Sequence, residues 1–224
     1  MKNAIILGSL SDIALEIMPR LVEDNWDVWG WNRNTPSVDD FPRWNLMVIA
    51  LGRVAPVGYW WENEGSEWDA CVRSNVLLPM RLLRRLWPLH EPEARVCFMA
   101  GSNPQKIMPG YSAYHFSKMG LLKLVEQLDA ETPDATFFAL GPGYVPTKIH
   151  AATLAQTAIR NERIERGGGT AHEDIYECLK WCIEQDKDTV GGRNICVSDP
   201  WRQGAVFSFH LEQSQSKMKL RRVE

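Results

Sequence analysis

A tyrosine and a lysine, Tyr114 and Lys118, stand four residues apart at the start of an apolar-periodic segment. Apolar residues recur at intervals of three and four from Ala113 to Leu128, which predicts an amphipathic helix. Side chains four apart share one face of a helix, so the phenol and the ammonium would be neighbours. A nearby cation favours the phenolate, and we therefore expect a lowered pKa that lets Tyr114 act as acid or base.

The pair alone is also what a solvated helix face produces by chance, so its neighbours decide the interpretation. Upstream, Arg95–Ser102 predicts a buried strand that ends in a small-residue turn with a serine. Downstream, Ala135–Leu140 predicts another strand, followed by Gly-Pro-Gly-Tyr-Val-Pro-Thr. This order of strand, serine, Tyr-x-x-x-Lys helix, strand and Pro-Gly-x-Val-x-Thr resembles the short-chain dehydrogenase/reductase family over nearly the whole chain.

The resemblance implies a single α/β domain over residues 1–224, with a doubly wound, largely parallel, Rossmann-like sheet. It also implies a hydride transfer between a nicotinamide cofactor and a small carbonyl or alcohol substrate. In that scheme Tyr114 protonates the nascent alkoxide, while Lys118 lowers the pKa of the tyrosine and holds the nicotinamide ribose. Ser102 orients the carbonyl, and Asn75 supports a water that links the lysine to solvent.

The first predicted strand, Ala4–Leu7, runs into Gly-Ser-Leu-Ser-Asp-Ile-Ala and then a helix. Such a turn can hold a pyrophosphate at the helix N-terminus, although a strand–turn–helix without a ligand remains open. The family has three glycines here, whereas this chain keeps Gly8 and has Asp12 and Ala14 at the other two positions. The Asp12 carboxylate would repel phosphate unless it turns away, and it could instead cap the helix. The cofactor contacts expected in this turn are Gly8, Ser9, Ser11, Asp12 and Ile13.

The second predicted strand, Asp27–Trp31, ends in Asn32 and Arg33. An acid at this point of a dinucleotide-binding fold pairs with the ribose 2′-hydroxyl, and a cation suits a 2′-phosphate. No acid stands there, and the Arg33 guanidinium can grip phosphate. We therefore expect Asn32 and Arg33 to contact the cofactor and NADP to be preferred to NAD. The alternative is that Arg33 is a solvated surface residue.

Two further turns complete the expected cofactor site. The first follows the strand Leu46–Leu51, and the second is the Pro-Gly-x-Val-x-Thr turn. By the resemblance, Thr147 and the backbone near Val145 hold the carboxamide. The contacts expected from these turns are Ala50, Leu51, Gly52, Pro142, Gly143, Val145 and Thr147.

The segment between the second and fourth strands of the family pattern is shortened here. The family fits a helix, a strand and another helix into this region, but the chain offers only Thr35–Trp44. We expect a remnant strand around Val38 and Asp39, loops in place of the helices, and no full helix.

The long segment Glu67–Trp87 predicts one helix, and Asn75 lies within it. As a polar residue on an apolar helix, Asn75 could also be a satisfied core group. Apolar residues on this helix and on the predicted helix Ser112–Ala130 exceed what one core-facing stripe needs, which indicates a second buried face and a homodimer or homotetramer. These residues are Leu82, Leu83, Leu86 and Leu121.

The last third of the chain offers a candidate substrate lid and an unusual tail. Residues 148–170 combine a helical pattern with a glycine run, which is typical of a lid. Residues 200–224 end in a basic cluster and could be frayed or docked on a partner subunit. Six residues with large side chains could line a substrate pocket: Tyr59, Trp60, Trp61, Met108, Tyr144 and His150.

The composition is that of an ordinary soluble domain. A net charge of -3 gives no reason to expect nucleic acid or an anionic membrane as partner. The five cysteines lack the clustering of a zinc site, so we expect core thiols and no metal. We expect a cytoplasmic protein, because no signal peptide and no apolar run of about 18 residues is visible.

Two other functions remain open from the residues alone. The eroded glycine turn and the shortened segment would suit a protein that binds and senses NADP without turnover. A nucleotide-sugar epimerase or dehydratase would use the same pair, but such relatives carry a longer C-terminal substrate domain.

Overall fold

The computed structural model describes residues 2–101, 106–155 and 168–220. Within these ranges six strands form one sheet in the order β2-β1-β3-β4-β5-β6, and each neighbouring pair is parallel. The predicted doubly wound, parallel α/β sheet is confirmed. The strands are β1 (Lys2–Leu7), β2 (Trp26–Trp31), β3 (Trp44–Ile49), β4 (His90–Met99), β5 (Ala135–Gly141) and β6 (Asn194–Cys196).

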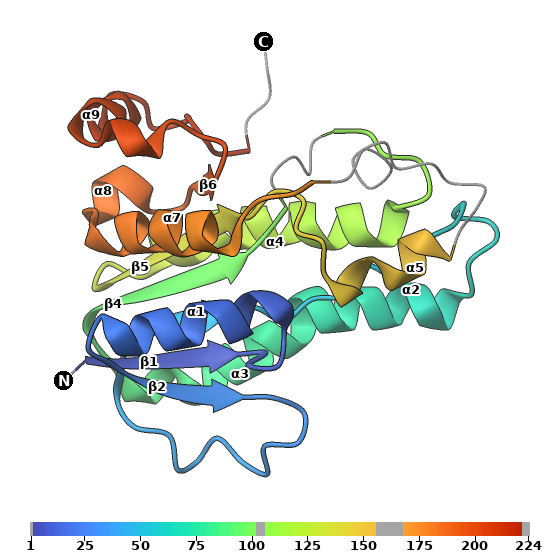
Figure 1. Cartoon of the computed structure of the whole chain (residues 1–224), viewed down its shortest axis with the longest axis horizontal. Coiled ribbons are helices and arrows are strands. Elements are labelled where there is room, and N and C mark those ends of the chain that lie inside the picture. The colour runs from blue at the N-terminus through green and yellow to red at the C-terminus, as the bar shows by residue number, and fades with distance from the viewer. Residues whose placement is uncertain (1, 102–105, 156–167, 221–224) are drawn as a thin grey trace.

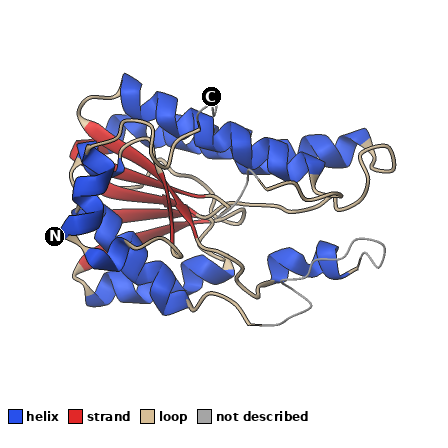
Figure 2. Ribbon diagram, turned by 90° about the horizontal axis from the view of Figure 1, so that it is seen from above, coloured by secondary structure: helices blue, strands red, loops and turns tan. Residues whose placement is uncertain are grey.

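Two layers of helices enclose the sheet, with α1 and α7 on one face and α3 and α4 on the other (Figure 2). Both α2 and α4 project beyond the carboxyl ends of the strands (Figure 1). In the described part of the chain, no helix has the length and hydrophobicity needed to cross a bilayer. The helical segments are α1 (Asp12–Glu23), α2 (Gly65–Val72), η1 (Arg73–Leu77), α3 (Leu78–Leu86), η2 (Trp87–Leu89), α4 (Ser112–Glu131), η3 (Lys148–His150), α5 (Ala151–Leu154), α7 (His172–Glu184), α8 (Lys187–Val190), η4 (Trp201–Gln203) and α9 (Ala205–Glu212).

The core is divided by the sheet because successive side chains of a strand point to opposite faces. Ile6 packs in the cluster that contains residues of α1 and α7, and its neighbour Ile5 packs with residues of α3 and α4. Strands buried on both faces read as continuous apolar runs, as Ala135–Gly141 does. All five cysteines are buried free thiols.

The predicted helix Glu67–Trp87 begins earlier, at Gly65, and is not one regular helix. A π-helical turn, Arg73–Leu77, separates α2 from α3. The four leucines taken as signs of a second buried face all lie in the core of this chain, so that reasoning was wrong. The large apolar side chains exposed on these helices are instead Leu77 and Phe116.

The shortened segment between β2 and β3 holds no helix, as predicted, but the expected remnant strand around Val38 is wrong. Val38 is buried against the core, and Asp39 begins a turn. The Asp39 carboxylate accepts two hydrogen bonds of 2.7 Å from the guanidinium of Arg85 on α3. The segment is therefore held by apolar contacts of Val38 and Phe41 and by this ion pair, rather than by pairing in the sheet.

The described part of the C-terminal tail, residues 200–220, packs on its own domain and is not frayed, while docking on a partner subunit stays a prediction. Trp201, Phe207 and Leu211 are buried in the core cluster that contains α1 and α7. The buried guanidinium of Arg193 donates to the backbone carbonyls of Leu211 at 2.9 Å and Lys217 at 2.6 Å. Much of the expected lid, residues 156–167, lies outside the described residues, while η3 and α5 occupy its beginning.

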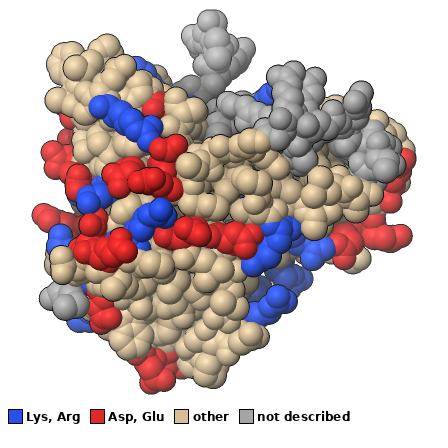
Figure 3. Space-filling model, in the orientation of Figure 1, with Lys and Arg blue, Asp and Glu red and all other residues tan. Residues whose placement is uncertain are grey.

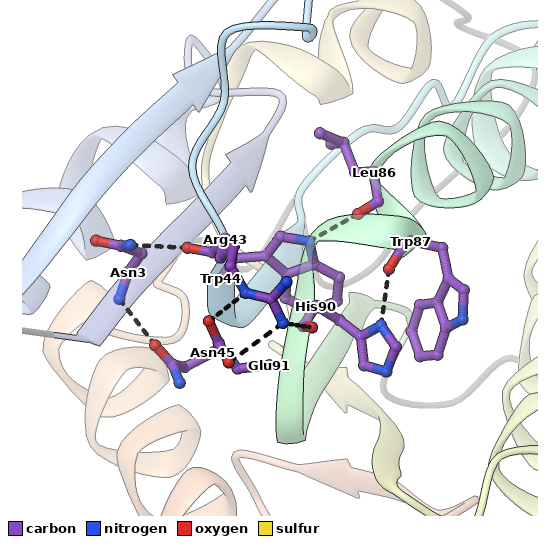
Figure 4. A network of polar contacts seen from close by, with 8 residues as sticks. All are labelled: Asn3, Arg43, Trp44, Asn45, Leu86, Trp87, His90 and Glu91. Carbon is purple, nitrogen blue, oxygen red and sulfur yellow. Dashed lines mark hydrogen bonds and ion pairs between the residues drawn. The ribbon is translucent and has the colours of Figure 1, made fainter.

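The amino ends of the central strands are closed by a network of polar contacts (Figure 4). The Trp44 indole N–H donates to the Leu86 carbonyl at 2.9 Å, and the Arg43 guanidinium bonds Glu91 at 2.6 Å. The Asn3 amide donates to the Arg43 carbonyl at 2.7 Å. These contacts join the starts of β1, β3 and β4. The polar groups at the amino ends of these strands are therefore bonded to one another.

Candidate active site

A cavity of about 230 Å³ opens at the carboxyl ends of the strands, where the chain crosses from β1 and β2 to β3. Such a reversal of strand order is where open α/β sheets bind ligands. The cavity walls come from the start of α1, the turns after β3 and β5, and α4. Predicted site residues that line it are Ser11, Asp12, Ile13, Ala50, Leu51, Gly52, Tyr114, Lys118, Pro142, Gly143, Val145 and Thr147.

Four predicted cofactor residues do not line the cavity: Gly8, Ser9, Asn32 and Arg33. Gly8 has a φ of +93°, and a Cβ there would lie 2.9 Å from the Ala50 carbonyl carbon, so only glycine permits this close approach. The Ser9 hydroxyl accepts a hydrogen bond from the Asn32 amide at 3.2 Å. Arg33 is exposed. Gly8, Ser9 and Asn32 therefore shape the turn beneath the cavity.

The helix-capping role considered for Asp12 belongs to Ser11. The Ser11 hydroxyl accepts from the Ala14 backbone N–H at 3.2 Å, and Asp12 is the first residue of α1. The Asp12 carboxylate instead accepts a hydrogen bond of 2.9 Å from the backbone N–H of Lys148 and pairs with the Lys148 ammonium at 3.0 Å. Burial alone would raise the pKa of Asp12, but the bonds from Lys148, with a smaller contribution from His172, lower it below its usual value.

The Tyr114–Lys118 pair lies in the cavity wall, but its electrostatics differ from the expectation. The Lys118 ammonium is buried, lies 5.9 Å from the centroid of the Tyr114 ring, and donates to the Met99 carbonyl at 2.8 Å. Burial raises the pKa of Tyr114 to about 12 and lowers the pKa of Lys118 to about 8. The predicted lowering of the tyrosine pKa is wrong because burial of the phenol, together with the nearby Cys71, raises it.

Asn75 is fully buried in the π-helical turn, and its amide is engaged by protein groups. Its oxygen accepts from the Arg53 backbone N–H at 2.7 Å, and its nitrogen donates to the Arg53 carbonyl at 2.9 Å and the Ser117 hydroxyl at 2.7 Å. Isolated π-turns occur often at functional sites. Here the turn ties α4 to the segment after β3, so the Asn75 side chain holds the cavity wall and does not contact Lys118 directly.

Ser102 lies outside the described residues. Its predecessor, Gly101, lines the cavity, and a Cβ on Gly101 would lie 3.9 Å from the Tyr114 hydroxyl oxygen. The turn after β4 therefore comes close to the Tyr114 hydroxyl at Gly101, the residue that precedes Ser102 in the sequence.

The comparisons with known proteins support a fold assignment. No family model matches the chain. An uncharacterized oxidoreductase of Schizosaccharomyces pombe is 23% identical over 143 residues, which cover 63% of this chain and 56% of that protein. A short-chain dehydrogenase/reductase from Saccharomyces cerevisiae superposes with a TM-score of 0.76 at 16% identity, covering 89% of this chain and 97% of that one. The chain has the short-chain dehydrogenase/reductase fold.

The same fold appears in a solved complex with NADPH. A small-chain dehydrogenase in complex with NADPH matches with a TM-score of 0.75 at 14% identity, over 87% of this chain and 95% of that one. The match to the S. pombe protein spans little more than half of that protein's length.

Several residues that line the cavity were not expected there from the sequence, among them Met99, Gly101 and Lys148. Lys148 had been assigned to the expected lid and not to the cofactor site, yet it lines the cavity. Its position directly after Thr147, as a cation next to a cofactor-binding turn, is the sequence signal that could have identified it. Of the six residues proposed for a substrate pocket, His150 alone lines this cavity. Trp60 and Trp61 are largely exposed, and Tyr59 stacks on Trp61 at 4.9 Å.

Proposed function

We propose that the protein is an NADP-dependent oxidoreductase that interconverts a small carbonyl compound and its alcohol. The observation that carries this proposal is the shared cavity of Tyr114, Lys118 and the N-terminal end of α1. One end supplies a proton donor, and the other supplies backbone N–H groups and the positive end of a helix dipole. The close packing of Gly8 against the Ala50 backbone supports the proposal indirectly, because it holds the turn that leads into the start of α1.

The protein residues would manage the proton and the orientation of the substrate. A bound nicotinamide supplies or accepts the hydride. With a pKa raised to about 12, Tyr114 carries its proton at neutral pH and is prepared to donate it to the substrate oxygen. Lys118 retains most of its charge below a pKa of about 8 and would restore the proton and hold the ribose hydroxyls.

The preference for NADP rests on Arg33 and on the absence of an acid at the end of β2. The NADPH held by one relative of the same fold supports a phosphorylated cofactor. Thr147 and the backbone near Val145, which line the cavity, would hold the carboxamide. Ser102 would orient the carbonyl from the end of β4.

The function is tested by following NADPH absorbance with a panel of aldehydes and ketones. We expect oxidation of NADPH that depends on one class of carbonyl and is lost in Tyr114→Phe. A fluorescence titration of NADPH should accompany the assay. Binding without turnover across a broad panel would overturn the enzyme proposal and favour the second candidate, a non-catalytic NADP sensor. The replacement of a turn glycine by Asp12 is the observation that favours a sensor.

A homodimer or homotetramer is the assembly we propose, with α2–α3 and α4 at the interface. Its support is now the exposure of Leu77 (45%) and Phe116 (59%) on these helices. Light scattering at micromolar concentration should give at least twice the 25.6 kDa of one chain. A Phe116→Glu variant should shift the mass towards the monomer, and a monomeric wild type would contradict the proposal.

A further inference from the structure

The Asp12–Lys148 pair at the rim of the cavity is unlike anything expected from the sequence. Asp12 replaces a turn glycine, so an unpaired carboxylate would face any phosphate bound at the start of α1. Lys148 meets it from the turn after β5, and both residues line the cavity. Elsewhere, the surface over α1 and α7 carries both kinds of charge, with acidic side chains more numerous than basic ones (Figure 3).

Three contacts fix the position of Lys148, one through its backbone and two through its ammonium. Its backbone N–H donates to Asp12, and its Nζ donates to the Leu10 carbonyl at 2.9 Å and pairs with the Asp12 carboxylate at 3.0 Å. A lysine ammonium has three N–H donors. Two are used by groups of the described chain, so one remains to point at a ligand, and the side chain is 67% exposed.

We propose that Lys148 binds the diphosphate of the dinucleotide and that Asp12 positions it there. The ammonium would take over part of the role of the missing glycines, which let backbone N–H groups approach phosphate. The Asp12 carboxylate keeps Lys148 beside the turn, and the lysine in turn neutralises the charge of the carboxylate. This inference rests on the proposed dinucleotide-binding function.

The test measures dissociation constants of NADPH by tryptophan fluorescence at fixed salt. Lys148→Met should weaken binding about 10- to 100-fold, the usual worth of a charge-assisted hydrogen bond. Lys148→Arg should retain most of the affinity because the positive charge remains. A matched control is Lys180→Met, which removes the ion pair of Lys180 with Asp24, 2.6 Å apart at the opposite end of α1, and should leave binding unchanged.

A double variant separates direct binding from simple neutralisation of Asp12. If Lys148 contacts the diphosphate, Asp12→Asn with Lys148→Met should bind NADPH more weakly than Asp12→Asn alone. Equal affinities of these two variants would overturn the proposal. Inorganic pyrophosphate should also compete with NADPH better in wild type than in Lys148→Met, and equal competition would overturn it as well.

Failure of the underlying function has a different signature. If wild type bound neither NADPH nor NADH, the proposed oxidoreductase function would fall and this inference with it. If wild type bound NADPH and a folded Lys148→Met variant bound it equally well, the inference about Lys148 alone would fall.

Discussion

The two ends of the cavity are built in different ways. At the α4 end, Lys118 is 4% exposed and Asn75 is fully buried, and hydrogen bonds tie both to neighbouring elements. At the α1 end, Asp12 and Lys148 form an ion pair whose lysine side chain is 67% exposed. The motif of the first end matches the family pattern, whereas the second end departs from it in its glycines and in the missing strand after β2.

The difference shows which parts of the site depend on burial. A buried ammonium has a shifted pKa and needs fixed partners, so few residues can replace it. An exposed ion pair contributes about 0–1 kcal/mol to stability, so charges at the α1 end can be rearranged without unfolding the domain. Phosphate can also be bound by several kinds of donor, including backbone N–H, lysine and arginine. We therefore expect changes at the α4 end to have the larger effects.

Tyr114→Phe should have the largest effect. General acid catalysis contributes about 10²–10⁴-fold, and the phenyl ring preserves the packing, so turnover should fall by that factor while NADPH affinity stays nearly unchanged. Tyr59→Phe, which changes an aromatic side chain outside the cavity lining, is the control. Activity of Tyr114→Phe within twofold of wild type would refute the acid role.

Lys118→Met should reduce both turnover and cofactor affinity, because one ammonium serves both. We expect a loss of turnover of about 10²-fold and a weaker NADPH complex. Steady-state rates and a fluorescence titration measure the two effects separately. A change in one quantity without the other would show that the residue has a single role.

The pH dependence of stability tests the burial of Lys118. Its folded pKa, about 8, lies below the ordinary lysine value of 10.5, so the unfolded chain binds the proton more strongly between these limits. The free energy of unfolding should therefore rise between pH 8 and 10.5, relative to Lys118→Met, by on the order of 3 kcal/mol. The rate of the proposed carbonyl reduction should fall around pH 8, where the ammonium of the folded protein loses its proton. Parallel stability curves for the two proteins would contradict the shifted pKa.

Arg33→Ala should have a smaller effect, confined to cofactor choice. A contact to the 2′-phosphate is worth ~1.5–3 kcal/mol, so the variant should lose most of a ten- to hundredfold preference for NADPH over NADH. Arg84→Ala, on the exposed side of α3, is a control of the same charge. Equal affinities of wild type for the two cofactors, or a preference for NADH, would show that Arg33 is only a surface residue.

Much of the fold could be predicted from the sequence because its signals are local. The apolar runs located β1 to β5, although β4 begins at His90 and not at Arg95, and the 3.6-residue periodicity identified α4. The resemblance to the family then pointed to the strand-end turns, and most of the residues expected there line the cavity. The length of Thr35–Trp44 alone excluded a full helix there.

Other features were decided by the tertiary structure because they depend on distant residues. Whether Leu82 or Leu121 is an interface or a core residue depends on what the sheet places against it, and both are core. The tail is held by Arg193, which donates to three carbonyls of the tail, those of Leu211, Ser214 and Lys217, and to the Asp188 carbonyl of α8. The contact between Asp12 and Lys148 joins positions 136 residues apart.

The pKa of Tyr114 shows the division most clearly. Its spacing from Lys118 is written in the sequence, and that spacing correctly placed both residues in one cavity wall. The direction of the pKa shift depends on how much water the fold removes from the phenol, a sum over β4, α2 and α4 that no local pattern contains. The sequence by itself determined which groups meet, and the packing around them determined which protonation state they hold.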